Sequence, residues 1–335
     1  MNLMLAGDIG GTKTQLGLFS FQDNRPVLLK EGTFVSANYA GLAPFVTEFL
    51  KGQNMAVQGA CFGVAGPVRE GRADLTHLPW VVDKRQLASA LNLDRVVVIN
   101  DLTAIAEAIP WLAPQDLFTL NAGTSDSGGA MAVIAPGTGL GEAFLIREGD
   151  TYLVAASQGG HADFAHNTTL ETDLLQYLHR QTGHVSFEDV CSGLGIRNLY
   201  RFLKETGQSA VPAWFEEQLA AGADPTPLII EAAVNTDRSC PVARDTLELF
   251  LSILGAEAGN LVLKVLATGG IFLGGGIPPR ILPAPQKGPF LSSFFAKGPM
   301  APLMTRIPVH VILNRQAALF GAAIHGYERG KFFIS

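Results

Sequence analysis

The stretch LMLAGDIGGTKTQLGLF, residues 3–19, decides the first element of the fold. Its apolar start at 3–6 and the run QLGLF at 15–19 are strand-like, and they flank a turn rich in glycine. This pattern predicts a β-hairpin around a glycine loop. Dinucleotide-binding loops and Walker phosphate loops open a helix instead, so the sequence excludes both motifs at this position.

The loop of this hairpin has the composition of a phosphate-binding site. Glycines let backbone N–H groups come close to phosphate oxygens. Asp8 follows the first strand directly and is placed to hold Mg²⁺, either directly or through a water molecule. Taken alone, the loop is equally compatible with a plain turn that carries a solvated aspartate. The candidate ligand-binding residues are Gly7, Asp8, Gly10, Gly11, Thr12, Lys13 and Thr14.

A second glycine loop repeats this arrangement further along the chain. Strands are predicted at 130–135 and 142–147, and Gly137, Thr138 and Gly139 lie between them. Thr138 offers a hydroxyl and a backbone N–H to a β- or γ-phosphate. The repeat of strand, glycine loop and strand predicts two related halves, joined near 110–121. Two such loops at equivalent places indicate phosphate binding more strongly than either does alone.

A third glycine motif, Gly274-Gly275-Gly276, ends a predicted strand at 270–273. Three consecutive glycines cost conformational entropy on folding, so their presence needs a structural reason. One reason is a close approach of the backbone to an adenine or its ribose. The other is a tight turn before Pro278, and the residues alone do not choose between them.

Asn100 and Asp101 follow a β-branched run at 95–99 that predicts a buried strand. In open α/β sheets, ligands gather at the carboxyl ends of strands. Phosphoryl transfer to a hydroxyl needs a group that orients and deprotonates it, and a carboxylate suits this role. Asn100 is able to bond a neighbouring hydroxyl. Asp101 is also a good N-cap for the helix that follows, and the two roles are compatible.

Two later segments supply candidate sugar contacts. QGGHADF, residues 158–164, combines loop glycines with the polar side chains of Gln158 and His161. Ser186 and Asp189 resemble a capping box, which places Glu188 in the first turn of a helix predicted over 187–205. The helix dipole favours an anion at that point, so the residues alone explain Glu188 without a ligand.

The rest of the chain predicts an α/β fold in which strands and helices alternate. The Pro- and Gly-rich segment 278–302 is predicted to expose its phenylalanines. Helices are predicted at about 41–51, 84–92, 101–110, 169–181, 212–220, 226–235, 242–267 and 315–327, and further strands at 57–64 and 308–313.

Composition limits the classes of function. The net charge of −6 argues against a nucleic-acid or anionic-membrane partner. The three cysteines are scattered and form no C-x-x-C pair, so we expect no disulfide framework and no zinc site. The apolar stretch 247–277 is interrupted by charges and glycines and is not expected to cross a membrane. With no signal peptide in the sequence, we expect a cytoplasmic protein.

Together these motifs resemble the bacterial glucokinase family over nearly the whole chain. The resemblance rests on an ordered set of stretches, each of moderate specificity. They are GDIGGTKT (7–14), FGVAGPV (62–68), LTHLPW (75–80), INDLTAIAEAIP (99–110), GTGLGEAFL (137–145), QGGHADFA (158–165), GHVSFEDVCSGLGIRNLY (183–200) and GGIFLGGGIPPRIL (269–282).

The resemblance implies an actin-like, ribonuclease-H-like ATPase fold with two α/β domains, 1–110 plus 314–335 and 111–313, and an interdomain cleft. It implies ATP-dependent phosphorylation of D-glucose to glucose 6-phosphate, the entry step of glycolysis, with Mg²⁺ and in a homodimer. By the same resemblance Asp101 is the catalytic base and also contacts the sugar. Asn100, His161 and Glu188 hold the sugar, and the glycine loops hold phosphates.

Two positions depart from the family pattern. His77 stands where the family often has an asparagine, and we expect a structural role near the cleft for it. Gln158 stands where the family commonly has a glutamate that contacts a sugar hydroxyl. A neutral amide loses a charge-assisted hydrogen bond, about 1 kcal/mol, which is about fivefold in affinity. This leaves open a kinase for another hexose or an amino sugar. A catalytically silent sugar sensor is the alternative from another class, although Asp8, Thr138 and Asp101 are all present.

Overall fold

The computed structural model describes residues 3–11, 13–52, 56–75, 78, 80–235, 237–282 and 287–331. The contacts within the chain divide it into two units. Unit 1 comprises Met1–Asp116, Val154–Ala156 and Asn314–Ser335, and unit 2 comprises Leu117–Leu153 and Ser157–Leu313. Each unit contains a sheet with helices, so the predicted α/β class is confirmed. The domain limits given above stay a prediction.

The sheet of unit 1 has five strands in the order β3-β2-β1-β4-β7. β2 is antiparallel to both β1 and β3, whereas β4 is parallel to β1 and β7 is parallel to β4. The expected hairpin is therefore present as β1 and β2. The strands are β1 (Leu3–Ile9), β2 (Lys13–Gln22), β3 (Arg25–Val35), β4 (Val57–Val64) and β7 (Val96–Asn100). A separate two-stranded sheet pairs β5 (Arg72–Asp74) with β6 (Val81–Asp83).

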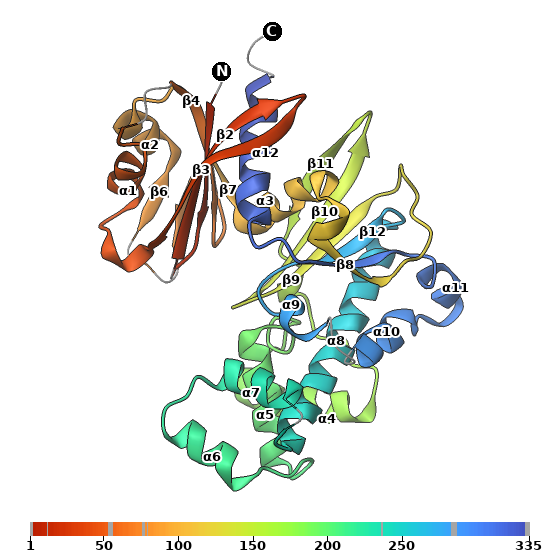
Figure 1. Cartoon of the computed structure of the whole chain (residues 1–335). Helices are drawn as coiled ribbons and strands as arrows, with labels where there is room; N and C mark the ends of the chain where they lie inside the picture. Colours follow the sequence, from red (N-terminus) through yellow and green to blue (C-terminus); the bar gives the residue numbers. More distant parts are fainter. Residues whose placement is uncertain are drawn as a thin grey trace. The chain divides into compact units, whose positions relative to one another are not determined.

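Helices cover both faces of this sheet (Figure 1). Successive side chains of a strand point to opposite faces, so β1 contributes to two cores. Leu5 packs in the core of α1 (Leu42–Phe49) and α2 (Lys84–Leu91). Ala6 packs in the core of α3 (Asp101–Ala108) and α12 (Ala317–Lys331).

The sheet of unit 2 has six strands in the order β11-β10-β9-β12-β13-β8. β9 and β10 form an antiparallel hairpin, and β12 and β13 continue from β9 in parallel. Unit 1 has the same succession, so the predicted repeat of two related halves is confirmed. The strands are β8 (Leu117–Asn121), β9 (Met131–Pro136), β10 (Leu140–Glu148), β11 (Thr151–Ser157), β12 (Gly270–Leu273) and β13 (Val309–Ile312).

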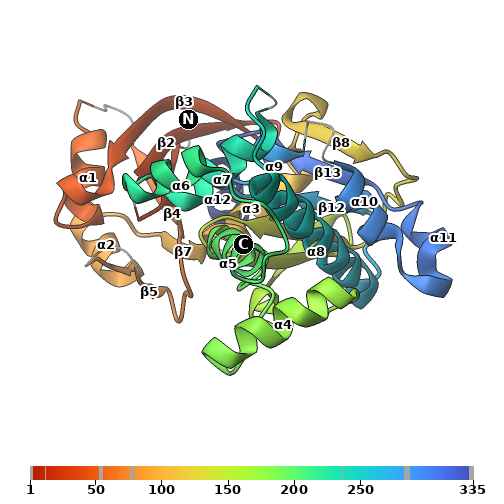
Figure 2. The same ribbon diagram turned by 90° about the horizontal axis from the view of Figure 1, so that it is seen from below.

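The helix α8 (Pro241–Val265) is the centre of the helical part of unit 2 (Figure 2). It packs against α5 (Gly193–Glu205), α7 (Pro225–Val234) and α10 (Lys287–Phe295). By length and composition α8 is apolar enough to cross a membrane, but 78% of its most apolar window is buried inside the fold, as in the core helix of a globular protein. The other helices of unit 2 are α4 (Thr169–Thr182), α6 (Ala213–Ala220), α9 (Pro278–Ile281) and α11 (Ala301–Met304).

Three expectations from the sequence were incomplete or wrong. The strands β3, β8 and β11 were not predicted, because they are edge strands made mostly of exposed and half-buried residues and lack a continuous apolar run. The helix predicted from 187 begins at Gly193. Phe290 and Phe294 are fully buried rather than exposed, since α10 turns them toward the core of unit 2.

Gly255 tests the close crossing of α8 and α10. A methyl group at this position would overlap the backbone carbonyl of Phe290. Alanine normally favours a helix over glycine by about 1 kcal/mol, but overpacking costs about 1–3 kcal/mol. We therefore expect Gly255→Ala to lower the free energy of unfolding by up to about 2 kcal/mol in urea titrations.

The matched control is Gly288→Ala on α10, where an added methyl group meets no atom within 4 Å. It should cause no loss of stability. Equal stability of the two variants would show that α8 and α10 do not approach as closely as described.

Candidate active site

The candidate residues form two groups, one in each unit. Asp8, Asn100 and Asp101 belong to unit 1, together with the glycine loop between β1 and β2. Gln158, His161 and Glu188 belong to unit 2, together with the loop between β9 and β10 and the Gly274–Gly276 turn.

The β1–β2 loop of unit 1 is held by hydrogen bonds at its base. The Gly10 N–H donates to the Lys13 carbonyl at 3.1 Å, and the Ser36 hydroxyl donates to the Gly10 carbonyl at 2.9 Å. The Thr14 hydroxyl lies 2.9 Å from that of Ser36 and is fully buried. Gly7 is also buried, and its missing side chain leaves room for Phe62. Thr14 and Gly7 thus lie beneath the loop, whereas Lys13 is exposed.

The remaining predicted residues of this loop are Asp8, Gly11 and Thr12. Thr12 lies outside the described residues, and Gly11 is half-buried. Asp8 pairs with Gln15, one position before Ile9 and Thr14, the last pair of β1 with β2. It is therefore the acidic side chain at the strand end from which the loop starts.

Asp8 is electrostatically unfavourable as an anion in the protein alone. Burial and, to a lesser extent, the negative charge of Asp101 raise its pKa to about 7, whereas Lys13 acts in the opposite direction. Two neighbouring carboxylates with too little positive charge form a donor set suited to a hard cation. No cluster of three or more metal-binding side chains occurs among the described residues. Mg²⁺ characteristically binds one or two carboxylates together with substrate phosphates, so this pair fits Mg²⁺.

Asn100 and Asp101 stand at the junction of β7 and α3. The Asn100 side chain is the N-cap, because its Oδ1 accepts from the N–H groups of Leu102 at 2.9 Å and Thr103 at 3.3 Å. Its Nδ2 donates to the Gly66 carbonyl at 3.0 Å. The capping role expected of Asp101 thus belongs to Asn100, and Asp101 is the first residue of the helix.

Asp101 is a half-buried carboxylate whose Oδ1 accepts from the Leu102 N–H at 2.9 Å. Burial raises its pKa, although hydrogen bonds from the Leu102 N–H and from the Asn100 side chain oppose the shift. A raised pKa makes a carboxylate a better proton acceptor for a hydroxyl.

In unit 2 the second and third glycine motifs meet. The Gly137 carbonyl accepts from the Gly193 N–H at 2.8 Å, and Thr138 is exposed at the tip of the loop. The Gly274 N–H donates to the Ile134 carbonyl at 2.9 Å. Gly275 has a φ of 82°, and a side chain there would overlap the backbone of Pro136. The triple glycine therefore serves close packing beside the loop, as well as any contact with a ligand.

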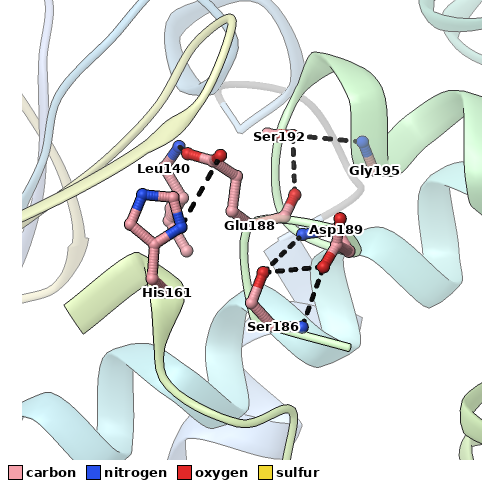
Figure 3. Close-up of polar contacts among 7 residues, drawn as sticks. All are labelled: Leu140, His161, Ser186, Glu188, Asp189, Ser192 and Gly195. Carbon is pink, nitrogen blue, oxygen red and sulfur yellow. Dashed lines mark hydrogen bonds and ion pairs between the residues drawn. The ribbon is translucent and has the colours of Figure 1, made fainter. Parts of the chain in front are cut away.

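Glu188 connects the phosphate-loop strand to the candidate sugar segment (Figure 3). Its Oε2 accepts from the Leu140 N–H at 2.9 Å, and its Oε1 lies 3.9 Å from the Nδ1 atom of His161. Its own N–H donates to the Gly160 carbonyl at 2.8 Å. A side chain at Gly139 would overlap the Glu188 carboxylate, so this glycine is required for the contact.

The expected capping box forms, but not at a helix start. The Ser186 N–H and hydroxyl donate to Asp189 Oδ2 at 2.9 and 2.8 Å, and the Asp189 N–H donates back to the Ser186 hydroxyl at 3.4 Å. These bonds close a turn, and α5 begins later, capped by Ser192 (Figure 3). The helix-dipole explanation of Glu188 was therefore wrong, because Glu188 lies in this turn.

The sugar segment itself is the short 3₁₀ helix η4 (Gly159–His161). Gln158 precedes it with an exposed side chain, and the imidazole of His161 is 61% exposed, so both are accessible to a ligand. His184 Nε2 lies 2.8 Å from the Asp163 carboxylate just beyond the segment. Exposed hydroxyl, imidazole, amide and carboxylate groups on neighbouring loops suit a polyol that is held close to a phosphate.

The sequence analysis missed one buried residue of this region, Glu142 on β10. Its side chain is 1% exposed, and neither carboxylate oxygen has a hydrogen-bond partner among the described residues. The available signal was a lone carboxylate inside the strand LGEAFL, at a position that faces the core.

Known proteins match this chain along nearly its whole length. The glucokinase family model matches residues 5–328. A curated glucokinase of Trichormus variabilis is 42% identical over 340 residues, which cover 97% of this chain and 98% of that protein. A solved glucokinase from an Antarctic psychrotroph has a TM-score of 0.83 at 32% identity, over 98% of this chain and 99% of that one.

Two more distant structures share the fold. A glucokinase of Balamuthia mandrillaris in complex with glucose has a TM-score of 0.80 at 21% identity, over 98% of this chain and 94% of that one. A ROK family glucokinase of Streptomyces griseus in complex with glucose and AMPPNP has a TM-score of 0.63 at 22% identity, over 98% and 100%. With its repeated actin-like architecture and its end-to-end match to the family model, this chain belongs to the glucokinase family.

Proposed function

We propose that this protein transfers the γ-phosphoryl group of ATP to O6 of D-glucose. The observation that carries the proposal is the Glu188 carboxylate, which accepts from the N–H that follows the phosphate loop and lies beside His161. A phosphate-binding loop and a polyol-binding segment are thus neighbours within unit 2. Relatives in complex with glucose, or with glucose and an ATP analogue, support the same pair of substrates.

In this proposal each group has one task. Backbone N–H groups of the two glycine loops and the Thr138 hydroxyl bind phosphate oxygens and stabilise charge on the transferred group. Asn100, Gln158, His161 and Glu188 bind sugar hydroxyls. Asp101 also contacts the sugar and accepts the proton of its O6 hydroxyl. The backbone at Gly274–Gly276 lies beside the adenine or its ribose.

Asp8 is the proposed metal ligand, directly or through water. When bound, Mg²⁺ supplies positive charge to the β- and γ-phosphates. Asp8 then keeps its negative charge despite burial and despite Asp101, because the cation offsets both effects. Lys13, exposed at the start of β2, adds positive charge to the phosphate side.

The surroundings of the reaction are also part of the proposal. We propose domains at 1–110 plus 314–335 and at 111–313, a homodimeric assembly, a cytoplasmic location and a role at the entry of glycolysis. The net charge of −6 supports small-molecule substrates over nucleic acid.

The first experiment is a sugar panel. Purified protein with Mg-ATP should release ADP with glucose and much less with mannose, fructose, glucosamine or N-acetylglucosamine. The Asp101→Ala protein serves as the control for sugar-independent ATP hydrolysis. Faster turnover on another sugar would redirect the proposal to that hexose, for which the exposed amide of Gln158 is the motivating feature. Saturable sugar binding without turnover would favour a sensor.

Replacement of the proposed base should separate binding from chemistry. We expect Asp101→Ala to keep glucose affinity within about tenfold and to lower kcat by at least about a hundredfold, as for other general bases. Calorimetric titration and steady-state kinetics measure the two effects. Asp94→Asn, an exposed aspartate before β7, is the matched control and should retain its kcat. An Asp101 variant with most of its turnover would remove this residue from the role.

Asp8 should make metal affinity and stability respond to pH in opposite directions. Its folded pKa of about 7 exceeds the ordinary aspartate pKa of 3.8, so the native state binds more protons between these values. Without metal, the Asp8 contribution to stability is thus lost as pH rises through this window. We expect Asp8→Asn to raise the apparent Tm above pH 7 by about 2–4 °C.

The pH dependence of Mg²⁺ binding has the opposite sign. Wild-type Mg²⁺ affinity should increase between about pH 6 and about pH 8 as Asp8 ionises, and Asp8→Asn should lose that increase. Thermal melts with and without Mg²⁺ and a Mg²⁺ titration of turnover measure both effects. An Asp8→Asn protein that is less stable than wild type at high pH without metal would contradict the raised pKa of Asp8.

A further inference from the structure

Glu142 is the one described glutamate whose buried oxygens both lack a hydrogen-bond partner. It is 1% exposed, on β10 between β11 and β9 in the sheet of unit 2. An unpartnered carboxylate is costly in such surroundings, and its ionised form is far more costly than its neutral form. The mechanism proposed above makes no use of this residue, so its presence in an otherwise apolar strand needs another explanation.

The position of Glu142 links it to the sugar segment. It lies on β10 two residues after Leu140, whose N–H bonds to Glu188. A side chain at Gly159 would overlap Glu142 Oε2, so the carboxyl group lies directly against the Gly159 backbone. Gly159 is the first residue of η4, between Gln158 and His161. The Glu142 carboxyl group therefore packs directly against the turn that contains the proposed sugar-binding residues Gln158 and His161.

The next residue of the turn is packed as tightly. A side chain at Gly160 would overlap the Leu140 carbonyl, and the Gly160 carbonyl accepts from the Glu188 N–H. The Gly159 N–H donates to the Ser157 hydroxyl at 2.9 Å. Any displacement at Gly159 is thus passed on to a segment that contacts the phosphate-loop strand on one side and Glu188 on the other.

The charges around Glu142 leave it without a partner cation. On α8, Glu257 is fully buried and takes up the neighbouring donors, with Lys264 Nζ at 3.2 Å and Asn260 Nδ2 at 2.8 Å. Burial and, to a lesser extent, the charge of Glu257 raise the pKa of Glu142 to about 7, against the opposing effect of Lys264. The adjacent strands β9 and β11 contain no Asp, Glu, Lys, Arg or His.

The other titratable groups near Glu142 come from the loops and helices packed on β10. Burial raises the pKa of Cys191, and the negative charges of Glu257, Glu142 and Glu171 act in the same direction. His161 belongs to η4, and Glu188 contacts both His161 and the Leu140 N–H. None of these groups donates a hydrogen bond to the Glu142 carboxyl among the residues that the structure describes.

We propose that Glu142 is a positioning residue for sugar binding, which holds Gln158 and His161 in place when it is protonated and loosens them when it is ionised. The inference rests on the proposed function. The Gly159 backbone packs against the Glu142 carboxyl group. An ionised carboxylate at this site is therefore solvated only if the Gly159 backbone moves away. The proton on Glu142 thus sets the fraction of molecules with a preformed sugar segment, and the apparent KM for sugar varies inversely with that fraction.

The test compares wild type with Glu142→Gln, which keeps the shape of the neutral acid. KM and kcat for glucose are measured at saturating Mg-ATP at about pH 6 and about pH 8. The ratio of the wild-type KM to the Glu142→Gln KM should rise about three- to tenfold over this interval, while the ratio of the kcat values stays constant. Because both proteins carry Asp8, Asp101 and His161, the pH response of those groups cancels in the ratios.

The control is Glu171→Gln, which replaces a buried glutamate of α4 that bonds to the Asn167 N–H and does not touch Gly159. Its KM ratio to wild type should not change with pH. A KM ratio for Glu142→Gln that is equal at both pH values would overturn the inference. If wild type phosphorylates none of the sugars, the proposed function fails first, and that outcome is visible before any variant is made.

A second pair of variants tests the contact without relying on pH. Gly159→Ala should raise the KM for glucose, because its methyl group displaces the Glu142 carboxyl and with it the turn. Adding Glu142→Ala removes the obstacle, so the double variant should have a lower KM than Gly159→Ala alone. If the two substitutions simply multiply their effects on KM, the contact does not position the segment.

Discussion

The hydrogen bond from the Leu140 N–H to the Glu188 carboxylate is the constraint on which the candidate site of unit 2 depends. It connects the turn before α5 to Leu140, the first residue of β10, which directly follows the loop proposed to bind phosphate. The same glutamate bonds through its backbone to Gly160 and approaches His161 with its second oxygen. The two segments proposed to bind phosphate and sugar are thereby packed against each other.

Glycine makes this body possible. At Gly139 a side chain would displace the Glu188 carboxylate, and at Gly160 it would meet the Leu140 carbonyl. Gly275 adds a left-handed backbone conformation beside Pro136. In each case the reason is a close approach between protein segments. The glycines of these motifs thus shape the protein itself, in addition to leaving room for phosphate oxygens.

Each unit contains a buried carboxyl group with a raised pKa. Asp8 in unit 1 and Glu142 in unit 2 each have a pKa near 7, for the same two reasons of burial and a neighbouring acid. Their surroundings nevertheless differ. Asp8 stands near the end of a strand beside the glycine loop that is proposed to bind phosphate, whereas Glu142 is enclosed under a backbone turn. The Asp8 carboxylate therefore suits the proposed metal ion, whereas the Glu142 carboxyl group favours its protonated form.

By itself the sequence determined the local elements and the chemistry of the loops. The hairpin around residues 7–14, the strand at 57–64, the strand at 270–273 and the repeated glycine loop follow from short-range patterns of apolar, β-branched and glycine residues, and the structure contains them. The family also follows from residues that stand close together in the chain. The edge strands β3 and β11 did not follow, because half-exposed strands lack a continuous apolar run.

Only the tertiary structure decided what the polar residues do. Asn100 rather than Asp101 caps α3, and Glu188 lies in a turn rather than a helix. Thr14 is buried beneath its loop, and Glu142 supports Gly159. These roles depend on partners tens of residues away or on which face of a strand is covered. A hydrogen bond or a desolvated charge is a property of the assembled neighbours, and the chain order does not contain that information.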